Sequence, residues 1–347
     1  MASDSLVYKV EDRSLLLPLY KRLLIAPLIK LIPARVNPNS ITHAGHLLNL
    51  LGVAVLLALW PVGGWPFAFA VLCVQLYNWC DNADGAHARA TNQCSALGEF
   101  LDHGLDLLNT TYIAYLAAMS VGAEPLWWVA LALVLPGAAA MTYWEQAQTG
   151  MFHLGMLNQV ESIMLLSVTL LVAAIFGTQL YAVVHLGPIN ARMVLLTFVF
   201  TTASVGILHG IWRVSRRGYM QLISALPLLS FCAIVFVAAW TSALSPIAAI
   251  VVGTAGNVFF GLRMLRHRLS AKRPKIEVGL LLGSLFLSGP IVWRLLGRSV
   301  GETTQIVLAA ATCTFLGVLA ILSAREGVMR VGVIDREAAL ARASAGE

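Results

Sequence analysis

Ten apolar runs, separated by short polar segments, follow one another along most of the chain. An α-helix needs about 20 mainly apolar residues to cross the hydrocarbon of a bilayer. Runs of this length and number predict an all-α fold, that of a polytopic integral membrane protein with about ten transmembrane helices. The runs lie at 43–60, 64–81, 98–121, 126–147, 159–177, 190–212, 222–242, 244–262, 276–296 and 303–323.

The segment before the first run has a different pattern. Residues 14–33 are largely apolar but are interrupted by Lys21, Arg22 and Lys30 and by three prolines. Such a segment suits the membrane interface, where basic side chains reach the lipid headgroups, better than a span. We therefore predict an N-terminal interfacial amphipathic helix. The sequence NPNSIT that follows has the form of a turn and a helix cap, with Asn39 as the cap.

Composition agrees with a membrane protein. The chain is 59% hydrophobic and only 12% charged, and its mean hydropathy is +0.79. Five cysteines are scattered without metal-binding spacing, so they are expected to be small core residues rather than a disulfide framework. No secretory signal peptide is expected, and neither is a nucleic-acid partner.

The Lys and Arg residues indicate how the chain is oriented. If the N-terminus, the turn at 82–97, the loops at 148–158, 213–221 and 263–275, and the C-terminus share one side, 20 of the 23 basic residues lie there, all but Arg192, Arg294 and Arg298. By the positive-inside rule this side is cytosolic. The basic cluster at 263–275 is most simply part of the topology signal, and a contact with anionic lipid is the alternative.

Acidic side chains gather in a stretch that begins at Asp81. Asp81 and Asp84 are one turn apart on one face of a helix, and so are Asp102 and Asp106. The residues between the two pairs include Thr, Asn and Ser, which favour turns, and Ser95 is suited to cap a helix. The pattern predicts two antiparallel helices joined by a short turn, each presenting two carboxylates to the other.

Four carboxylates at one site repel one another unless a cation binds between them. Oxygen ligands without Cys or paired His favour Mg²⁺, Mn²⁺ or Ca²⁺ over zinc. Gly85 and Gly98 lack side chains where a ligand could approach the backbone. Arg89 supplies a guanidinium fork suited to phosphate, and the small Ala88 leaves the same helix face open. Together these features indicate phosphoryl or nucleotidyl transfer.

These residues form the pattern D-x2-D-G-x2-A-R-x8-G-x3-D-x3-D. It resembles the signature of the CDP-alcohol phosphotransferase family. The surrounding DG..AR.TN...LGE..DHG.D is similar to the choline/ethanolamine phosphotransferase branch, as are the segment from YKVEDRSLL to NPNSIT and the stretch from Tyr143 to Glu161. In this chain Ala86, His87 and Ala90 stand where that branch usually has Lys, Gln and Arg. The identity of the CDP-alcohol that donates the phospho-alcohol group therefore stays open.

The resemblance implies a set of site residues. Two Mg²⁺ ions, for which Mn²⁺ can substitute, would be held by Asp81, Asp84, Asp102 and Asp106. His103 would take the proton of the lipid acceptor, supported by Glu161, whereas Asp106 is the base proposed in the wider family. Glu161 could instead simply favour the positive N-terminus of its helix, and Glu145 is either a site residue or an interfacial acid. The residues assigned to the donor are Asn39, Gly85, Ala88, Arg89, Gly98 and Glu99.

The expected activity moves phosphoethanolamine or phosphocholine from a CDP-alcohol to diacylglycerol or a similar lipid, releasing CMP, in phospholipid biosynthesis. Family resemblance also implies a homodimer. One alternative is CDP-diacylglycerol-dependent transfer to a soluble alcohol or alcohol phosphate. Another is a transporter, which would spread its carboxylates through the spans instead of clustering them at one membrane edge. We expect an interfacial segment (1–42), a catalytic transmembrane core (43–212), and additional C-terminal helices with a cytosolic tail (213–347).

Overall fold

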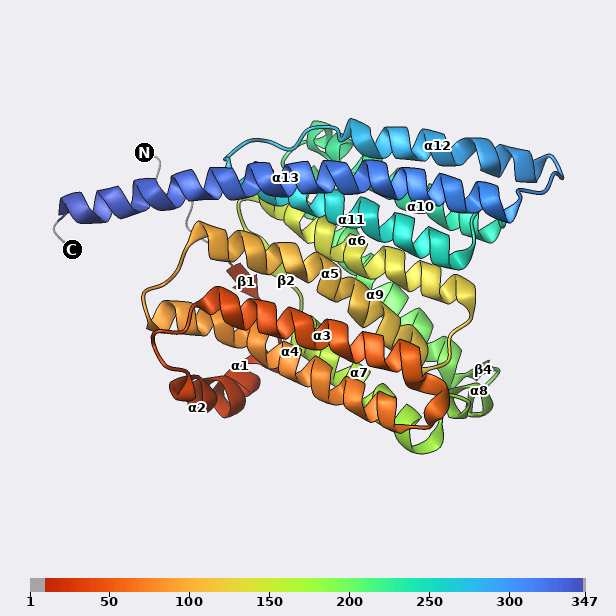
Figure 1. The fold of residues 1–347 in the computed structure, drawn as a ribbon, viewed down its shortest axis with the longest axis horizontal. Coiled ribbons are helices and arrows are strands. Elements are labelled where there is room, and N and C mark those ends of the chain that lie inside the picture. Colours follow the sequence, from red (N-terminus) through yellow and green to blue (C-terminus); the bar gives the residue numbers. More distant parts are fainter. Residues whose placement is uncertain (1–9, 346–347) are drawn as a thin grey trace. The chain divides into compact units, whose positions relative to one another are not determined.

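The computed structural model describes residues 10–345, which are mostly helical (Figure 1). Each predicted apolar run corresponds to one helix of at least 15 residues. These helices are α3 (Pro38–Leu59), α4 (Trp65–Ala90), α5 (Ala96–Ser120), α6 (Pro125–Thr149), α7 (Gln159–Phe176), α9 (Ala191–Ser215), α10 (Leu226–Trp240), α11 (Pro246–Leu269), α12 (Val278–Leu295) and α13 (Glu302–Ala345).

The connections contain only short elements. Three are helical turns: η4 (Trp60–Val62), α8 (Leu180–Val183) and η5 (Tyr219–Ser224). The strands form two pairs, β1 (Val10–Asp12) with β2 (Phe152–Leu154), and β3 (His185–Leu186) with β4 (Ile189–Asn190). The all-α fold class is therefore confirmed.

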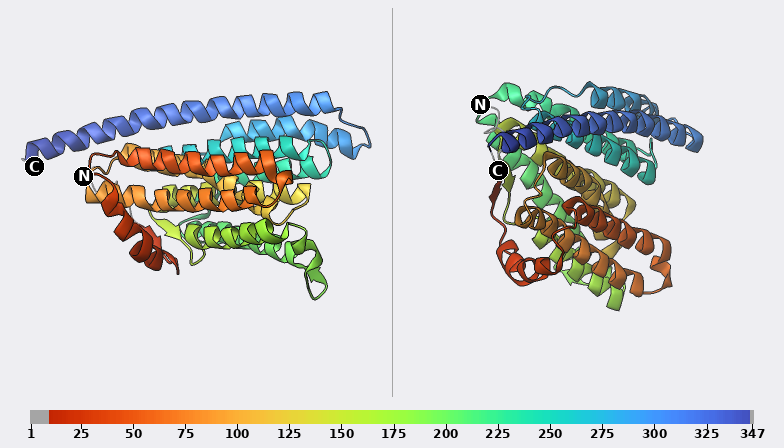
Figure 2. Two further views of the ribbon diagram at one scale, coloured as in Figure 1. Left: turned by 60° about the horizontal axis from the view of Figure 1, so that its bottom comes forward. Right: turned by 60° about the vertical axis from the view of Figure 1, so that its left-hand side comes forward.

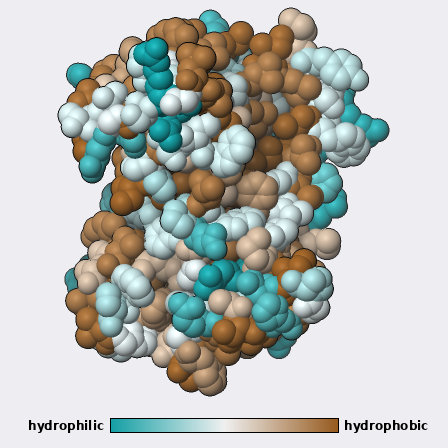
Figure 3. All heavy atoms as spheres, turned by 90° about the vertical axis from the view of Figure 1, so that its right-hand side faces the viewer, coloured by the Kyte–Doolittle hydropathy of each residue, from teal (hydrophilic) through white to brown (hydrophobic). Residues whose placement is uncertain are grey.

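Among the described residues, seven helices are long and apolar enough to cross a membrane: α3, α6, α7, α9, α11, α12 and α13. Large apolar side chains such as Ile175, Ile247 and Leu285 are at least 70% exposed, and apolar residues cover much of the surface in Figure 3. Apolar exposure on this scale, on helices long enough to span a bilayer, is typical of a surface that faces lipid. The chain is an integral membrane protein. Membrane crossing by α4 and α5, which carry the aspartates, and by the 15-residue α10 stays a prediction.

The N-terminal segment is helical but not a single regular helix. It consists of α1 (Leu17–Tyr20), the π-helical η2 (Lys21–Ile25), α2 (Ala26–Leu28) and the 3₁₀-helical η3 (Ile29–Leu31). Prolines lack an N–H and clash with the preceding turn, which explains the change of helix type along it. Tyr20 and Ile25 are buried, whereas Leu19 and Leu23 are exposed, as an amphipathic segment requires. Tyr8 and Lys9 of the predicted entry segment lie outside the described residues.

Contacts between residues divide the chain into two compact units. The first, here called the acidic unit, comprises Val10–Ala123, His153–Leu195 and the described part of Val331–Glu347. The second unit comprises Glu124–Phe152 and Leu196–Arg330. The three functional segments expected from the sequence follow other criteria and stay a prediction.

Glycines allow close helix packing in the acidic unit. α3 and α4 lie side by side (Figure 1, Figure 2). A Cβ added at Gly45 would lie 2.7 Å from the Cβ of Cys80, and one at Gly52 would lie 2.8 Å from that of Cys73. Such distances leave no room for a side chain, so the glycines set the approach of α3 to α4.

A buried ion pair joins α6 and α9 in the second unit. Arg213 donates to both carboxylate oxygens of Glu145, with Nη2 at 2.8 Å from Oε2. Glu145 is only 2% exposed, so its charge requires this partner. The pair gives Glu145 a structural role; a catalytic one stays a prediction.

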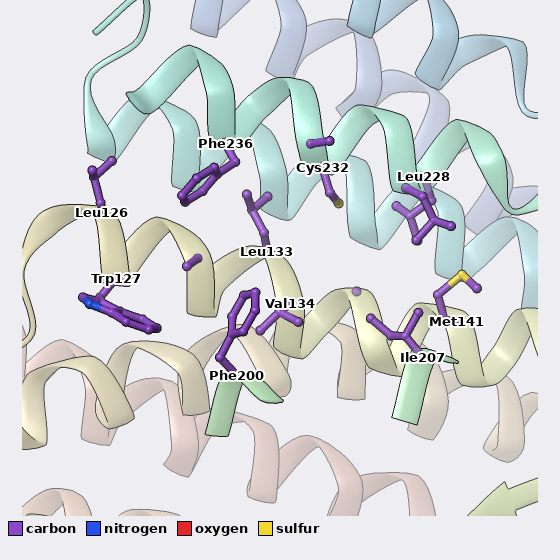
Figure 4. A pocket seen from close by; sticks show the side chains of 14 residues that line it. Leu126, Trp127, Leu133, Val134, Met141, Phe200, Ile207, Leu228, Cys232 and Phe236 are labelled. Carbon is purple, nitrogen blue, oxygen red and sulfur yellow. The ribbon is translucent and has the colours of Figure 1, made fainter. Parts of the chain in front are cut away.

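An apolar cavity of about 480 Å³ lies between α6, α9 and α10 of the second unit. Figure 4 shows side chains from all three helices pointing into it, among them Trp127, Phe200 and Phe236. Apolar cavities exclude water because water finds no hydrogen-bond partners there. Within a membrane this space is suited to a hydrocarbon chain.

Candidate active site

The predicted helical hairpin is present. α4 ends at Ala90 and α5 begins at Ala96, with a short turn between them. Ser95 has an extended backbone (φ −145°, ψ 154°), and its Oγ accepts a hydrogen bond of 3.0 Å from the N–H of Gly98. Ser95 is therefore the N-cap of α5, as predicted.

Three of the four aspartates converge. Asp81 of α4 and Asp102 and Asp106 of α5 each offer an oxygen within 4.8 Å of the other two. The Oδ1 atom of Asp102 is buried and has no hydrogen-bond partner among the described residues. Like charges at this spacing repel, and an unsatisfied buried carboxylate oxygen is costly. The cluster therefore fits a divalent cation that takes oxygen ligands, such as Mg²⁺ or Mn²⁺.

Asp84 is held differently. Its Oδ2 accepts a hydrogen bond of 2.5 Å from Oγ1 of Thr42 on α3, and its Oδ1 accepts one of 2.5 Å from the N–H of Gly85. The hydrogen bond from Thr42 therefore holds the Asp84 carboxylate toward α3. The structure does not bring Asp84 into the three-carboxylate group, and its role as a metal ligand stays a prediction.

Two residues that sequence reasoning missed hold the aspartates. Gln159, the first residue of α7, donates from Nε2 to Oδ2 of Asp81 at 2.8 Å and to the hydroxyl of Tyr77 at 3.2 Å. The Tyr77 hydroxyl in turn donates to Oδ1 of Asp106 at 3.2 Å. Tyr77 lies one turn before Asp81, and this spacing is the only local signal for its role.

Replacing Gln159 by Leu should weaken divalent-ion binding about 10–100-fold, the usual effect of removing a group that orients a metal ligand. Electron paramagnetic resonance of free Mn²⁺, titrated with the purified protein, measures this without relying on turnover. Gln75→Leu is a matched control, because Gln75 joins the same helices α4 and α7 through Oγ of Ser167 at 2.7 Å. Equal losses in both variants would mean that Gln159 contributes only to helix packing.

The candidate donor residues form two local pairs. A Cβ added at Gly85 would lie 3.3 Å from Nη1 of Arg89, so the guanidinium folds over this glycine. A Cβ added at Gly98 would lie 3.2 Å from Oδ1 of Asn39, so Asn39 contacts the first turn of α5. Ala88 is buried in α4. Glu99 lies in the first turn of α5, where an acid is favoured by the helix dipole.

The prediction that Asn39 caps α3 is wrong. The N-cap is Asn37, whose Oδ1 accepts a hydrogen bond of 2.9 Å from the N–H of Asn39. Pro38 explains the difference, because a proline has no N–H and a fixed φ and therefore favours the first helical position. The side chain of Asn39 is consequently not needed as a cap.

His103 and Glu161 lie in distinct settings. His103 is buried on α5, with Nδ1 3.6 Å from Oδ2 of Asp102. Glu161 accepts bonds at Oε1 from Oγ of Ser14 (2.6 Å) and from the N–H of Leu16 (2.8 Å). Its Oε2 accepts from the N–H of Asn158 (3.2 Å), which completes a capping box at the start of α7. Glu161 thus stabilises a helix N-terminus and holds the N-terminal segment; its action on His103 stays a prediction.

The C-terminal helix also reaches the hairpin within the acidic unit. The N–H groups of Ala96 and Leu97 donate to the carboxylate of Asp335 at 2.8 and 3.2 Å. These are among the first N–H groups of α5, which have no partner inside the helix. No sequence signal indicated Asp335, which lies more than 200 residues from this turn.

The chain is similar in sequence to known proteins over roughly half of its length. Cholinephosphotransferase 1 of Gallus gallus is 30% identical over 204 residues, which cover 56% of this chain and 58% of the relative. For Homo sapiens cholinephosphotransferase 1 the identity is 29% over 161 residues, 44% of this chain and 40% of the relative. The matches therefore span less than two thirds of these relatives. A match to the family described as CDP-alcohol phosphatidyltransferase covers residues 35–256, which include the whole hairpin. The chain belongs to the CDP-alcohol phosphatidyltransferase family.

Proposed function

We propose that the protein transfers phosphoethanolamine or phosphocholine from a CDP-alcohol to the hydroxyl of diacylglycerol or a similar lipid. The observation that carries this proposal is the convergence of the carboxylates of Asp81, Asp102 and Asp106. One oxygen of this group, Oδ1 of Asp102, is buried and has no hydrogen-bond partner among the described residues. Family membership and the cholinephosphotransferase relatives support it. The protein would act in phospholipid biosynthesis.

In this reaction the acceptor oxygen forms a bond to the phosphorus that carries the alcohol. The bond between that phosphorus and the oxygen it shares with CMP breaks, and CMP leaves. His103 is proposed to take the acceptor's proton, with Asp106 as the alternative base. Arg89 and Asn39 would hold the donor, Gly85, Ala88 and Gly98 would leave it space, and Glu99 would lie near the metal site.

The four aspartates, Asp84 included, are proposed to hold two Mg²⁺ ions, for which Mn²⁺ can substitute. When bound, such ions neutralise the negative charge of the diphosphate and of the leaving CMP. The protein's own contribution is to hold the carboxylates in place: Gln159 and Tyr77 bind Asp81 and Asp106, and Thr42 binds Asp84.

A donor panel tests the proposal. Purified protein in diacylglycerol-containing vesicles should release CMP from CDP-choline or CDP-ethanolamine. CDP-diacylglycerol with a soluble alcohol or alcohol phosphate should give no CMP; release from that donor alone would favour the other branch of the family. No CMP from any donor, combined with ion flux through proteoliposomes, would reject the transferase in favour of a transporter.

The membrane orientation is also a proposal, with the aspartates at the cytosolic face. A cysteine at Ser270, after α11, should react with an impermeant reagent only from the cytosolic side, and one at Ser299, after α12, only from the other. The background must lack the five native cysteines, all of which are free thiols. Labelling of both positions from one side would show that α12 does not cross the membrane. Homodimer formation stays a prediction, to be measured by cross-linking in the membrane.

A further inference from the structure

A second cavity, of about 350 Å³, lies between the end of α11 and the middle of α13, within the second unit. Unlike the cavity of Figure 4, its lining is polar and mainly basic. The residues that line it are Arg266, His267, Ser270, Lys272, Glu326 and Arg330. Three of these side chains, those of Arg266, Lys272 and Arg330, are positively charged and only Glu326 is acidic, so the cavity attracts anions.

Ion pairs neutralise some of the basic residues here but not all. Arg266 pairs with Glu326, and Nε of Arg263 lies 3.0 Å from Oε2 of the buried Glu277. Burial alone would raise the pKa of Glu277, but the neighbouring His267 and Arg263 outweigh it and the pKa lies below its usual value, so this carboxylate stays ionised. Lys272 and Arg330 have no carboxylate within ion-pair distance in the part of the chain that the structure describes.

A buried imidazole also lines the cavity. His267 is 5% exposed, and its Nε2 has no hydrogen-bond partner among residues 10–345. The nearest carboxylate oxygen, Oε1 of Glu277, lies 3.6 Å away, too far for a good hydrogen bond. His267 therefore contacts Glu277 only loosely, and its imidazole retains the capacity to donate a hydrogen bond to a group bound in the cavity.

We infer that this cavity binds a phosphate group through Lys272 and Arg330, with His267 and Ser270 as hydrogen-bonding partners. The cavity lies where the apolar helix α11 ends, so in a bilayer crossed by α11 it would face the lipid headgroups, which favours the phosphate of an anionic lipid over free phosphate. The sequence alone could not distinguish such a site from a topology signal, because a basic segment meets both requirements. The inference is independent of the proposed transferase activity.

Native mass spectrometry of the detergent-purified protein tests the site with three probes: phosphatidylglycerol, phosphatidylcholine and inorganic phosphate. The double variant Lys272→Gln, Arg330→Gln should bind phosphatidylglycerol about 25-fold more weakly, since each basic residue near anionic lipid contributes roughly a fivefold factor. The matched control is Arg273→Gln, Arg325→Gln, which removes the same charge from exposed neighbours that do not line the cavity. The control should retain most of the binding.

Every outcome decides the question. Equal losses in the two double variants would show general electrostatic attraction, and no loss in either would show that no site exists; both overturn the inference. Binding of inorganic phosphate that depends on Lys272 and Arg330, without retention of phosphatidylglycerol, would support a phosphate site with a soluble source. Unchanged phosphatidylcholine adducts, and retained binding in Lys272→Arg, Arg330→Lys, show that a loss does not come from misfolding.

Discussion

Asp102→Asn should reduce turnover below detection while the protein still folds and is extracted intact from the membrane. The carboxamide has nearly the same shape but carries no charge, so the cluster formed with Asp81 and Asp106 loses an anionic ligand. Oδ1 of Asp102 is buried without a hydrogen-bond partner in the described chain, so a cation is the group expected to satisfy it. CMP release at saturating Mg²⁺ measures the effect, and Asp81→Asn should behave in the same way.

Glu124→Gln is the matched control, because it makes the same chemical change at an exposed acid at the start of α6. It should leave CMP release unchanged. EDTA should abolish CMP release by the wild-type protein, and added Mg²⁺ or Mn²⁺ should restore it. Near-normal turnover of Asp102→Asn at saturating Mg²⁺ would contradict the metal assignment, and so would full activity in EDTA.

His103→Ala should lower kcat by about 10²–10⁴-fold, the range expected when a general base is lost. Mn²⁺ binding and donor binding should change little, because the aspartates remain. CMP release under saturating donor and lipid gives kcat, and Mn²⁺ titration provides the independent check. A decrease in kcat of less than about tenfold would favour Asp106 as the general base, since general acid–base catalysis contributes more than that.

A double-mutant cycle with Glu161→Gln decides how Glu161 acts. If Glu161 supports His103, the double variant should be little worse than His103→Ala alone, because residues acting as a unit are not additive. Ser14→Ala is the control, since it removes the 2.6 Å hydrogen bond to Glu161 and leaves the carboxylate in place. Additive losses, with Ser14→Ala reproducing the effect of Glu161→Gln, would assign Glu161 to the N-terminal segment alone.

The helices and the hairpin were predictable because their signals are local. An apolar run long enough to cross a bilayer must satisfy its backbone hydrogen bonds internally, so each of the ten runs forms a helix. Ser95 caps α5 because its hydroxyl reaches an N–H only three residues away. The spacing of Asp102 and Asp106 places both carboxylates on one helix face without any help from the rest of the fold.

Local signals did not distinguish between neighbouring residues of the same type. Asn37 and Asn39 are chemically identical caps, and only the position of Pro38 at the first helical turn decides for Asn37. Asp84 resembles Asp81 in sequence, but its carboxylate accepts a hydrogen bond from Thr42 of α3, which lies 42 residues away. Hydropathy alone likewise did not show that the interfacial segment changes helix type along its length.

Apart from Tyr77, the groups that hold the site come from distant parts of the chain, and local sequence patterns carry no information about them. Gln159 reaches Asp81 across 78 residues, and Asp335 reaches Leu97 across 238. An unremarkable glutamine or aspartate acquires such a role only when packing brings its helix to the hairpin. Apolar periodicity and capping act within a few residues and so determined the helices and the acidic face from sequence. The choice of which carboxylates converge, and of what supports them, depends on long-range packing and became visible only in three dimensions.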